Sequence, residues 1–122
     1  MTPQQTIMIV DDNVVNLRLA SDVLEIEGFT VLRCMDAENA LAVLEYILPN
    51  LILMDVALPG MDGLQLTRKL KADTRTKEIK IIALTAFAMK GDQEKMFAAG
   101  CDGYITKPID TRKFKAQITP YL

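Results

Sequence analysis

Short apolar runs alternate with longer amphipathic stretches along the whole chain. Several of the short runs, such as 51–54, have no inside–outside alternation, which is typical of strands in a sheet covered on both faces. The longer stretches repeat apolar residues every three or four positions, which is the period of a helix buried along one side. The pattern predicts strands at residues 7–10, 30–34, 51–54, 79–84 and 103–106.

Helices are predicted between these strands, and several of their ends carry recognisable signals. The first spans about 14–27 and ends at Gly28, a residue common just beyond a helix. The second continues until Pro49, and the last begins at Asp110, which is expected as its N-cap. Asp62-Gly63 is read as a turn. The fourth helix is predicted over Gly91 to Ala99 and is ended by Gly100. The apolar positions of the other helices are Leu17, Ala20 and Leu24; Ala37, Ala40, Leu41, Leu44 and Leu48; Leu66 and Leu70; and Phe114, Ile118 and Tyr121.

Five strands that alternate with five helices predict an α/β fold with helices on both faces of a parallel sheet. Right-handed crossovers leave few topologies for a chain of 122 residues. We therefore expect a flavodoxin-like (βα)5 architecture, a doubly wound parallel five-stranded sheet in the order 2-1-3-4-5. The chain has no repeat, low-complexity segment or linker, so residues 1–122 are expected to form a single domain.

The composition of the chain argues against several classes of partner. The net charge is −2 and the lysines and arginines look scattered, which argues against nucleic acid as a partner. No apolar run approaches a membrane span, and Met1 to Thr6 lacks the features of a signal peptide, so we expect a cytoplasmic protein without membrane contact. The chain has no His. Cys34 and Cys101 are interpreted as small buried residues, with no disulfide between them.

Polar side chains stand where four of the five predicted strands end. Each one alone would be an ordinary turn former, cap or surface charge. The carboxyl ends of parallel strands share one edge of the sheet, which is where ligands bind in this architecture. We therefore expect these side chains to converge. They are Asp11 and Asp12 after the first strand, Asp55 after the third, Thr85 at the fourth and Lys107 after the fifth; the small Ala86 follows Thr85, and Pro108 follows Lys107.

Three clustered carboxylates repel one another and require a cation. With only oxygen ligands in reach, the set favours a hard ion such as Mg²⁺. Counting Mg²⁺ and Lys107, the site is formally near neutral and could accept a phosphoryl group on Asp55, since aspartyl-phosphates are established intermediates. The phosphoryl oxygens would meet Mg²⁺, Lys107 and the Thr85 hydroxyl, while the small Ala86 would leave room.

These residues, at these spacings, closely resemble the receiver domain of bacterial two-component response regulators. The resemblance covers essentially the whole chain and is most specific at residues 9–13, 53–63 and 100–108. The segment 84–92 is most similar to single-domain, DivK-like regulators and to the receivers of hybrid kinases. The resemblance implies phosphorelay signalling, with a sensor histidine kinase or histidine phosphotransfer protein as donor and a downstream protein as target.

The resemblance also implies roles for individual residues. Asp55 would be the phosphoacceptor. Asp12, Asp55 and the carbonyl of Ala57 would bind Mg²⁺ directly, and Asp11 would do so through water. Receivers often carry a polar residue at the position of Ala57, a departure that affects reaction rate and not identity. The remaining implied roles are phosphoryl contact for Lys107, a cis bond before Pro108, and a switch pair formed by Thr85 and Tyr104.

Three other readings of the same residues fit less well. A Mg²⁺-dependent phosphohydrolase would need a second acid–base Asp just after Asp55 and a cap over the substrate, and Val56-Ala57 supplies no such Asp. An FMN carrier would need a Ser/Thr/Gly-rich phosphate loop where Asp11-Asp12 stands. A degenerate receiver that serves only as a scaffold would have lost acidic positions that are all filled here. We therefore expect a signalling domain and not a turnover enzyme.

Overall fold

The computed structural model describes residues 5–122. The expectation about a signal peptide rests mainly on residues 1–4, which lie outside that range. Five strands form one parallel sheet in the order β2-β1-β3-β4-β5, so the predicted topology is confirmed. The strands are β1 (Thr6–Val10), β2 (Thr30–Cys34), β3 (Leu51–Asp55), β4 (Lys80–Thr85) and β5 (Gly103–Thr106).

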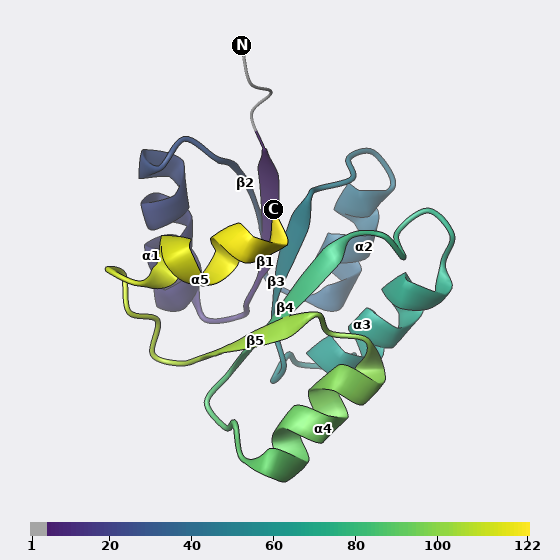
Figure 1. The fold of residues 1–122 in the computed structure, drawn as a ribbon. Coiled ribbons are helices and arrows are strands. Elements are labelled where there is room, and N and C mark those ends of the chain that lie inside the picture. The colour runs from purple at the N-terminus through teal and green to yellow at the C-terminus, as the bar shows by residue number, and fades with distance from the viewer. Residues whose placement is uncertain (1–4) are drawn as a thin grey trace.

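Helices cover both faces of the sheet (Figure 1). Two of them, α1 (Val14–Ile26) and α5 (Phe114–Ile118), share one apolar cluster with the sheet. The other three, α2 (Ala37–Leu44), α3 (Gly63–Ala72) and α4 (Lys90–Ala99), share a second cluster on the opposite face. A short 3₁₀ helix, Thr119–Tyr121, follows α5. Among the described residues, no helix is long and apolar enough to cross a membrane.

The central strand β3 explains how a carboxylate comes to stand at the edge of this core. All five of its residues are buried, because β1 and β4 flank it and helices cover both of its faces. Its last residue, Asp55, pairs in register with Leu84 of β4. The apolar run therefore delivers one acidic side chain to the carboxyl edge of the sheet and fixes it there.

The prediction that the second helix continues to Leu48 is wrong. Helix α2 ends at Leu44, and the chain then folds back through a turn in which the Ile47 N–H donates to the Val43 carbonyl at 3.1 Å. The chain must turn here because Asn50 forms two hydrogen bonds with Thr6 of β1. The Asn50 N–H donates to the Thr6 carbonyl, and the Asn50 side-chain oxygen accepts from the Thr6 N–H. Leu48 is consequently 48% exposed instead of buried.

Asp110 is also not the N-cap that the sequence predicted. Helix α5 begins at Phe114, and the Asp110 carboxylate instead accepts a hydrogen bond from the Arg112 N–H at 3.0 Å. The Asp110 carbonyl accepts from Lys113, which makes a separate turn before the helix. The apolar positions Phe114 and Ile118 are buried as expected. Local side-chain bonding of an Asp to the backbone two residues ahead competes with capping and here prevails.

Both cysteines are free and buried, as interpreted from the sequence. Burial, reinforced by the negative charge of Asp36, raises the pKa of the Cys34 thiol to about 11. Since the thiolate is the reactive form, native Cys34 should resist iodoacetamide at pH 8, while the unfolded chain should be alkylated at both thiols. Mass spectrometry after timed labelling, with and without denaturant, measures the difference. Equal labelling rates in the two states would contradict the burial of these thiols.

Candidate functional site

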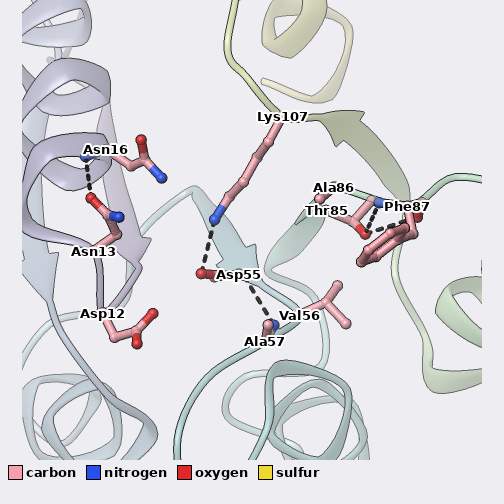
Figure 2. Close-up of a pocket in the computed structure, with 10 residues that line it drawn as sticks. All are labelled: Asp12, Asn13, Asn16, Asp55, Val56, Ala57, Thr85, Ala86, Phe87 and Lys107. Atoms are coloured by element: carbon pink, nitrogen blue, oxygen red, sulfur yellow. Dashed lines mark hydrogen bonds and ion pairs between the residues drawn. The ribbon is translucent and has the colours of Figure 1, made fainter.

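A cavity of about 400 Å³ opens at the carboxyl edge of the sheet (Figure 2). It lies where the loops after β1, β3, β4 and β5 meet, so residues far apart in sequence line a single space. Asp11 is buried and is not among its lining residues, and neither are Tyr104 and Pro108. The predicted site residues that do line it are Asp12, Asp55, Ala57, Thr85, Ala86 and Lys107.

The three predicted acidic residues form one cluster. Asp11 and Asp55 are 1% and 4% exposed, whereas Asp12 is exposed, and one carboxylate oxygen from each lies within 4.8 Å of the others. Burial raises the pKa of the Asp11 carboxyl above its ordinary value; the hydrogen bond from the Asn13 N–H opposes this shift, and the neighbouring Asp55 reinforces it. The cluster therefore carries the electrostatic repulsion that the sequence predicted.

Lys107 reaches into this cluster from the end of β5. Its ammonium nitrogen Nζ lies 2.9 Å from Asp55 Oδ2 and 3.3 Å from Asp11 Oδ2. Burial alone would lower the pKa of Lys107, but the hydrogen bond to Asp55 and the charges of both carboxylates outweigh it and raise the pKa. The ammonium thus stays charged. It balances one of the three carboxylate charges. The two remaining negative charges equal the charge that one divalent cation would balance.

The Lys107 backbone is fixed as firmly as its side chain. Its N–H donates to the Thr85 carbonyl at 2.7 Å, which ties the end of β5 to the end of β4. The peptide bond that joins Lys107 to Pro108 is cis. The bond between the Lys107 N–H and the Thr85 carbonyl holds the start of the lysine side chain at the rim of the cavity that it lines.

The Asp55 carboxylate is held at both oxygens. Oδ2 accepts from the Lys107 ammonium, and Oδ1 accepts from the Ala57 N–H at 3.0 Å. The loop after β3 therefore bends back toward Asp55, the last residue of the strand, and helps to orient its carboxylate toward the cavity (Figure 2). A carboxylate held in this way is already oriented toward the cavity, so any reaction at it would have a lower entropic cost.

On the opposite wall of the cavity, the Thr85 hydroxyl is engaged with its own loop. It donates to the Phe87 carbonyl at 2.8 Å and accepts from the Phe87 N–H at 3.0 Å (Figure 2). The small side chain of Ala86 follows directly and lines the cavity. In this arrangement, the bonds of the Thr85 hydroxyl run to Phe87 and not to Asp55.

Tyr104 lies on β5, one strand away from Thr85. In the register of these two strands, Tyr104 is opposite Ala83 and Thr106 is opposite Thr85. The Tyr104 ring is partly buried and meets the edge of Phe97 on α4, with centroids 6.3 Å apart and planes at 74°. This is a favourable aromatic geometry. It places Tyr104 against α4, the helix that follows the loop containing Phe87.

Sequence reasoning missed what Asp62 and Gly63 do. Asp62 begins α3: its carboxylate accepts from the Gln65 N–H at 2.8 Å, and the Gln65 side chain accepts in return from the Asp62 N–H. The spacing of Asp62 and Gln65 is a capping-box signal that could have identified the start of the helix. Gly63 packs so close to β3 that a Cβ atom there would lie 2.0 Å from the Asp55 carbonyl oxygen. No sequence signal gives that distance.

Comparison with known proteins identifies the family. Residues 7–119 match the response regulator receiver domain. The chain belongs to this family. It is 42% identical over 118 residues to the polar-differentiation response regulator DivK of Brucella anthropi, a match that covers 97% of this chain and 96% of that protein. It is therefore a DivK-like receiver domain of the two-component response regulators, as its motifs indicated.

Solved structures give the same result. The receiver domain of the sensor histidine kinase PA1611 from Pseudomonas aeruginosa PAO1, described with a magnesium ion coordinated in its active-site cleft, is 33% identical with a TM-score of 0.88, and the match covers 98% of both chains. The chemotaxis response regulator CheY4 of Vibrio cholerae shares the fold, with a TM-score of 0.93 at 22% identity over 98% of this chain and 100% of that chain. Receiver domains are signalling modules and not classical enzymes, so the phosphohydrolase alternative is set aside.

Proposed function

We propose that Asp55 accepts a phosphoryl group, with Mg²⁺ bound, from the phosphohistidine of a sensor histidine kinase or histidine phosphotransfer protein, and that this changes the contacts of the domain with a downstream protein. One observation carries the proposal: Asp55 is the buried carboxylate that both lines the open cavity and is oriented from two sides. The domain, residues 1–122, would do this in the cytoplasm.

The transfer would proceed on Asp55 itself. A carboxylate oxygen of Asp55 attacks the phosphorus, a P–O bond forms, the P–N bond of the donor breaks, and the imidazole leaves with the bonding electrons and takes up a proton. The Lys107 ammonium, now 2.9 Å from Asp55 Oδ2, would then contact a phosphoryl oxygen. The Thr85 hydroxyl would contact another, and Ala86 would leave space for the group.

The donor set fits Mg²⁺. Its side-chain donors are carboxylate oxygens, their separations allow a shared ion, and two of the three negative charges are left unbalanced by Lys107. We assign direct contacts to Asp12, Asp55 and the Ala57 carbonyl, and an indirect contact to Asp11. When bound, Mg²⁺ offsets the negative charge of the phosphoryl oxygens. The chain's own residues position the nucleophile and the lysine.

Incubation with a small phosphodonor such as phosphoramidate and Mg²⁺, followed by mass spectrometry, tests the proposal. One added phosphoryl group, located on the peptide that contains Asp55, is the expected result. Omission of Mg²⁺ or addition of a chelator should prevent the gain. A protein that stays unmodified with both reagents present would exclude the phosphoacceptor function.

Replacing Asp12 with Ala should weaken Mg²⁺ binding without destabilising the fold. Asp12 is exposed at the cavity and close to two buried carboxylates, so its loss should weaken Mg²⁺ binding and block phosphorylation. Unfolding of the apo protein should need as much denaturant as the wild type or more, because carboxylate repulsion is relieved. Titration with Mg²⁺ followed by NMR measures affinity, and Glu94→Ala, an exposed change on α4, is the control. Unchanged Mg²⁺ affinity would remove Asp12 from the ligand set.

The proposed switch has a spectroscopic test. A phosphoryl group at Asp55 should draw the Thr85 hydroxyl inward and free space for Tyr104, shifting an equilibrium between states that both exist beforehand. Beryllofluoride, which mimics the phosphoryl group, should therefore shift backbone NMR signals across α4, β5 and α5. Lys90, Lys95, Tyr104 and Arg112 are the residues to follow. Shifts confined to the rim around Asp55 would contradict a switch that reaches this face.

A further inference from the structure

Phe87 is an aromatic residue that is 71% exposed at the rim of the site. It lines the cavity that holds Asp55 and also a second cavity of about 230 Å³ on its other side. We call this second space the α3–α4 cavity. Its walls include the apolar side chains of Val56, Leu64 and Met96, with Asp92 and Lys95 at the α4 side.

The α3–α4 cavity and Phe87 are connected through one hydroxyl. Thr85 lines both cavities, and its Oγ1 makes two hydrogen bonds with the backbone of Phe87, one as donor and one as acceptor. These bonds fix the backbone of Phe87 in the position that leaves its ring in solvent. Figure 2 shows the Phe87 ring near Val56, and both residues line both cavities.

We infer that Phe87 is a positioning residue for Thr85, and that its ring enters the α3–α4 cavity when Thr85 turns toward the phosphoryl group. A hydroxyl has a single proton, so Thr85 cannot donate to the Phe87 carbonyl and to a phosphoryl oxygen at the same time. Turning the side chain toward Asp55 breaks the bonds that hold Phe87. The freed ring then lies next to an apolar space, and burial of an exposed aromatic ring is favourable.

The consequence is a coupling between the two events. Ring burial stabilises the state in which Thr85 has turned, and the two resting hydrogen bonds stabilise the state in which it has not. Phe87 thereby helps to set how strongly the site binds a phosphoryl group or its mimic. This inference rests on the proposed phosphoacceptor function. It adds an aromatic residue to the switch beside Tyr104, which is not among the residues that line the α3–α4 cavity.

Beryllofluoride binding to side-chain variants tests the coupling. Phe87→Ala keeps the backbone bonds to Thr85 but loses the ring, so the apparent affinity for beryllofluoride in Mg²⁺ should fall about tenfold, which is about 1.4 kcal/mol. Phe87→Leu should recover most of this loss. Met89→Ala is the matched control, because Met89 is an apolar residue of the same loop, 76% exposed, and lines neither cavity. It should leave the affinity unchanged.

A larger side chain in the wall of the α3–α4 cavity provides a second, independent test. Leu64→Phe should occupy the space and weaken beryllofluoride binding even though Phe87 is present. If both changes act through the same cavity, the double variant Leu64→Phe/Phe87→Ala should be no weaker than either single variant. Additive losses would show that Leu64 and Phe87 act separately and would overturn the inference.

Fluorine NMR reports on the ring directly. Incorporated 4-fluorophenylalanine gives a signal for Phe87 that the Phe87→Leu variant identifies, and a soluble nitroxide broadens the signals of exposed rings. The Phe87 signal should lose this broadening when beryllofluoride binds. Persistent broadening, while the Ala57 amide shifts to show that beryllofluoride is bound, would overturn the inference and leave the proposed function standing. Absence of any response at Ala57, together with no phosphoryl gain on Asp55, would defeat both.

Discussion

Asp55→Asn is expected to abolish phosphorylation while leaving the fold intact. The carboxamide has nearly the shape of the carboxylate, and its oxygen can still accept from the Ala57 N–H or the Lys107 ammonium. It is, however, a far weaker nucleophile and carries no charge for Mg²⁺. We expect the rate of phosphoryl gain to fall by at least about a thousandfold, which corresponds to about 4 kcal/mol of activation free energy.

The measurement is phosphoryl gain over time by mass spectrometry, combined with denaturant unfolding to compare stability. Asp62→Asn is the matched control, since it makes the same chemical change in the loop–helix junction after Asp55, and Asn caps helices as well as Asp does. That variant should be phosphorylated at the wild-type rate. If Asp55→Asn still gained a phosphoryl group at the normal rate, on Asp12 or elsewhere, the acceptor assignment would be wrong.

Much of this fold could be predicted because its strands are short and apolar, and because several of the helices between them have recognisable end signals in the sequence. The run that ends at Asp55 has no polar residue before its last position, and such a run is stable only where both faces are covered. Once the sheet is parallel, its carboxyl ends must share an edge, so the strand-end residues of four segments were predicted to meet. The cavity that Asp12, Asp55, Thr85 and Lys107 share is the geometric result.

What escaped prediction depends on choices between local hydrogen bonds and on packing distances. Asp110 could cap a helix or bond the Arg112 N–H, and both are short-range options for the same side chain. The spacing of apolar residues did not predict that α2 ends before Leu48. The helix ends early because Asn50 forms two hydrogen bonds with Thr6 on β1, a contact between distant segments. The bonds between Thr85 and Phe87 are likewise invisible to periodicity, although they decide where the hydroxyl points in the resting domain.

Gly63→Ala should destabilise the domain and slow its phosphorylation. Gly63 begins α3, and its N–H donates to the Val56 carbonyl at 3.2 Å, which draws the helix against the end of β3. A methyl group there would lie 2.0 Å from the Asp55 carbonyl oxygen and 2.9 Å from its carbonyl carbon. Both are backbone atoms, so the helix or the strand end must move. Overpacking of this kind costs about 1–3 kcal/mol.

Gly91→Ala supplies the contrast, because it makes the same substitution in the first turn of α4, where an added Cβ meets nothing within 4 Å. There the change should stabilise the domain by about 0.5–1 kcal/mol, the usual advantage of Ala over Gly in a helix. Denaturant unfolding measures both free energies, and phosphoryl gain measures both rates. Only Gly63→Ala should slow the reaction, because the backbone that its methyl group would displace is that of Asp55, the proposed phosphoacceptor. Equal stability and equal rates in the two variants would show that α3 can retreat without disturbing Asp55, and the close packing of Gly63 on β3 would then have no part in positioning the site.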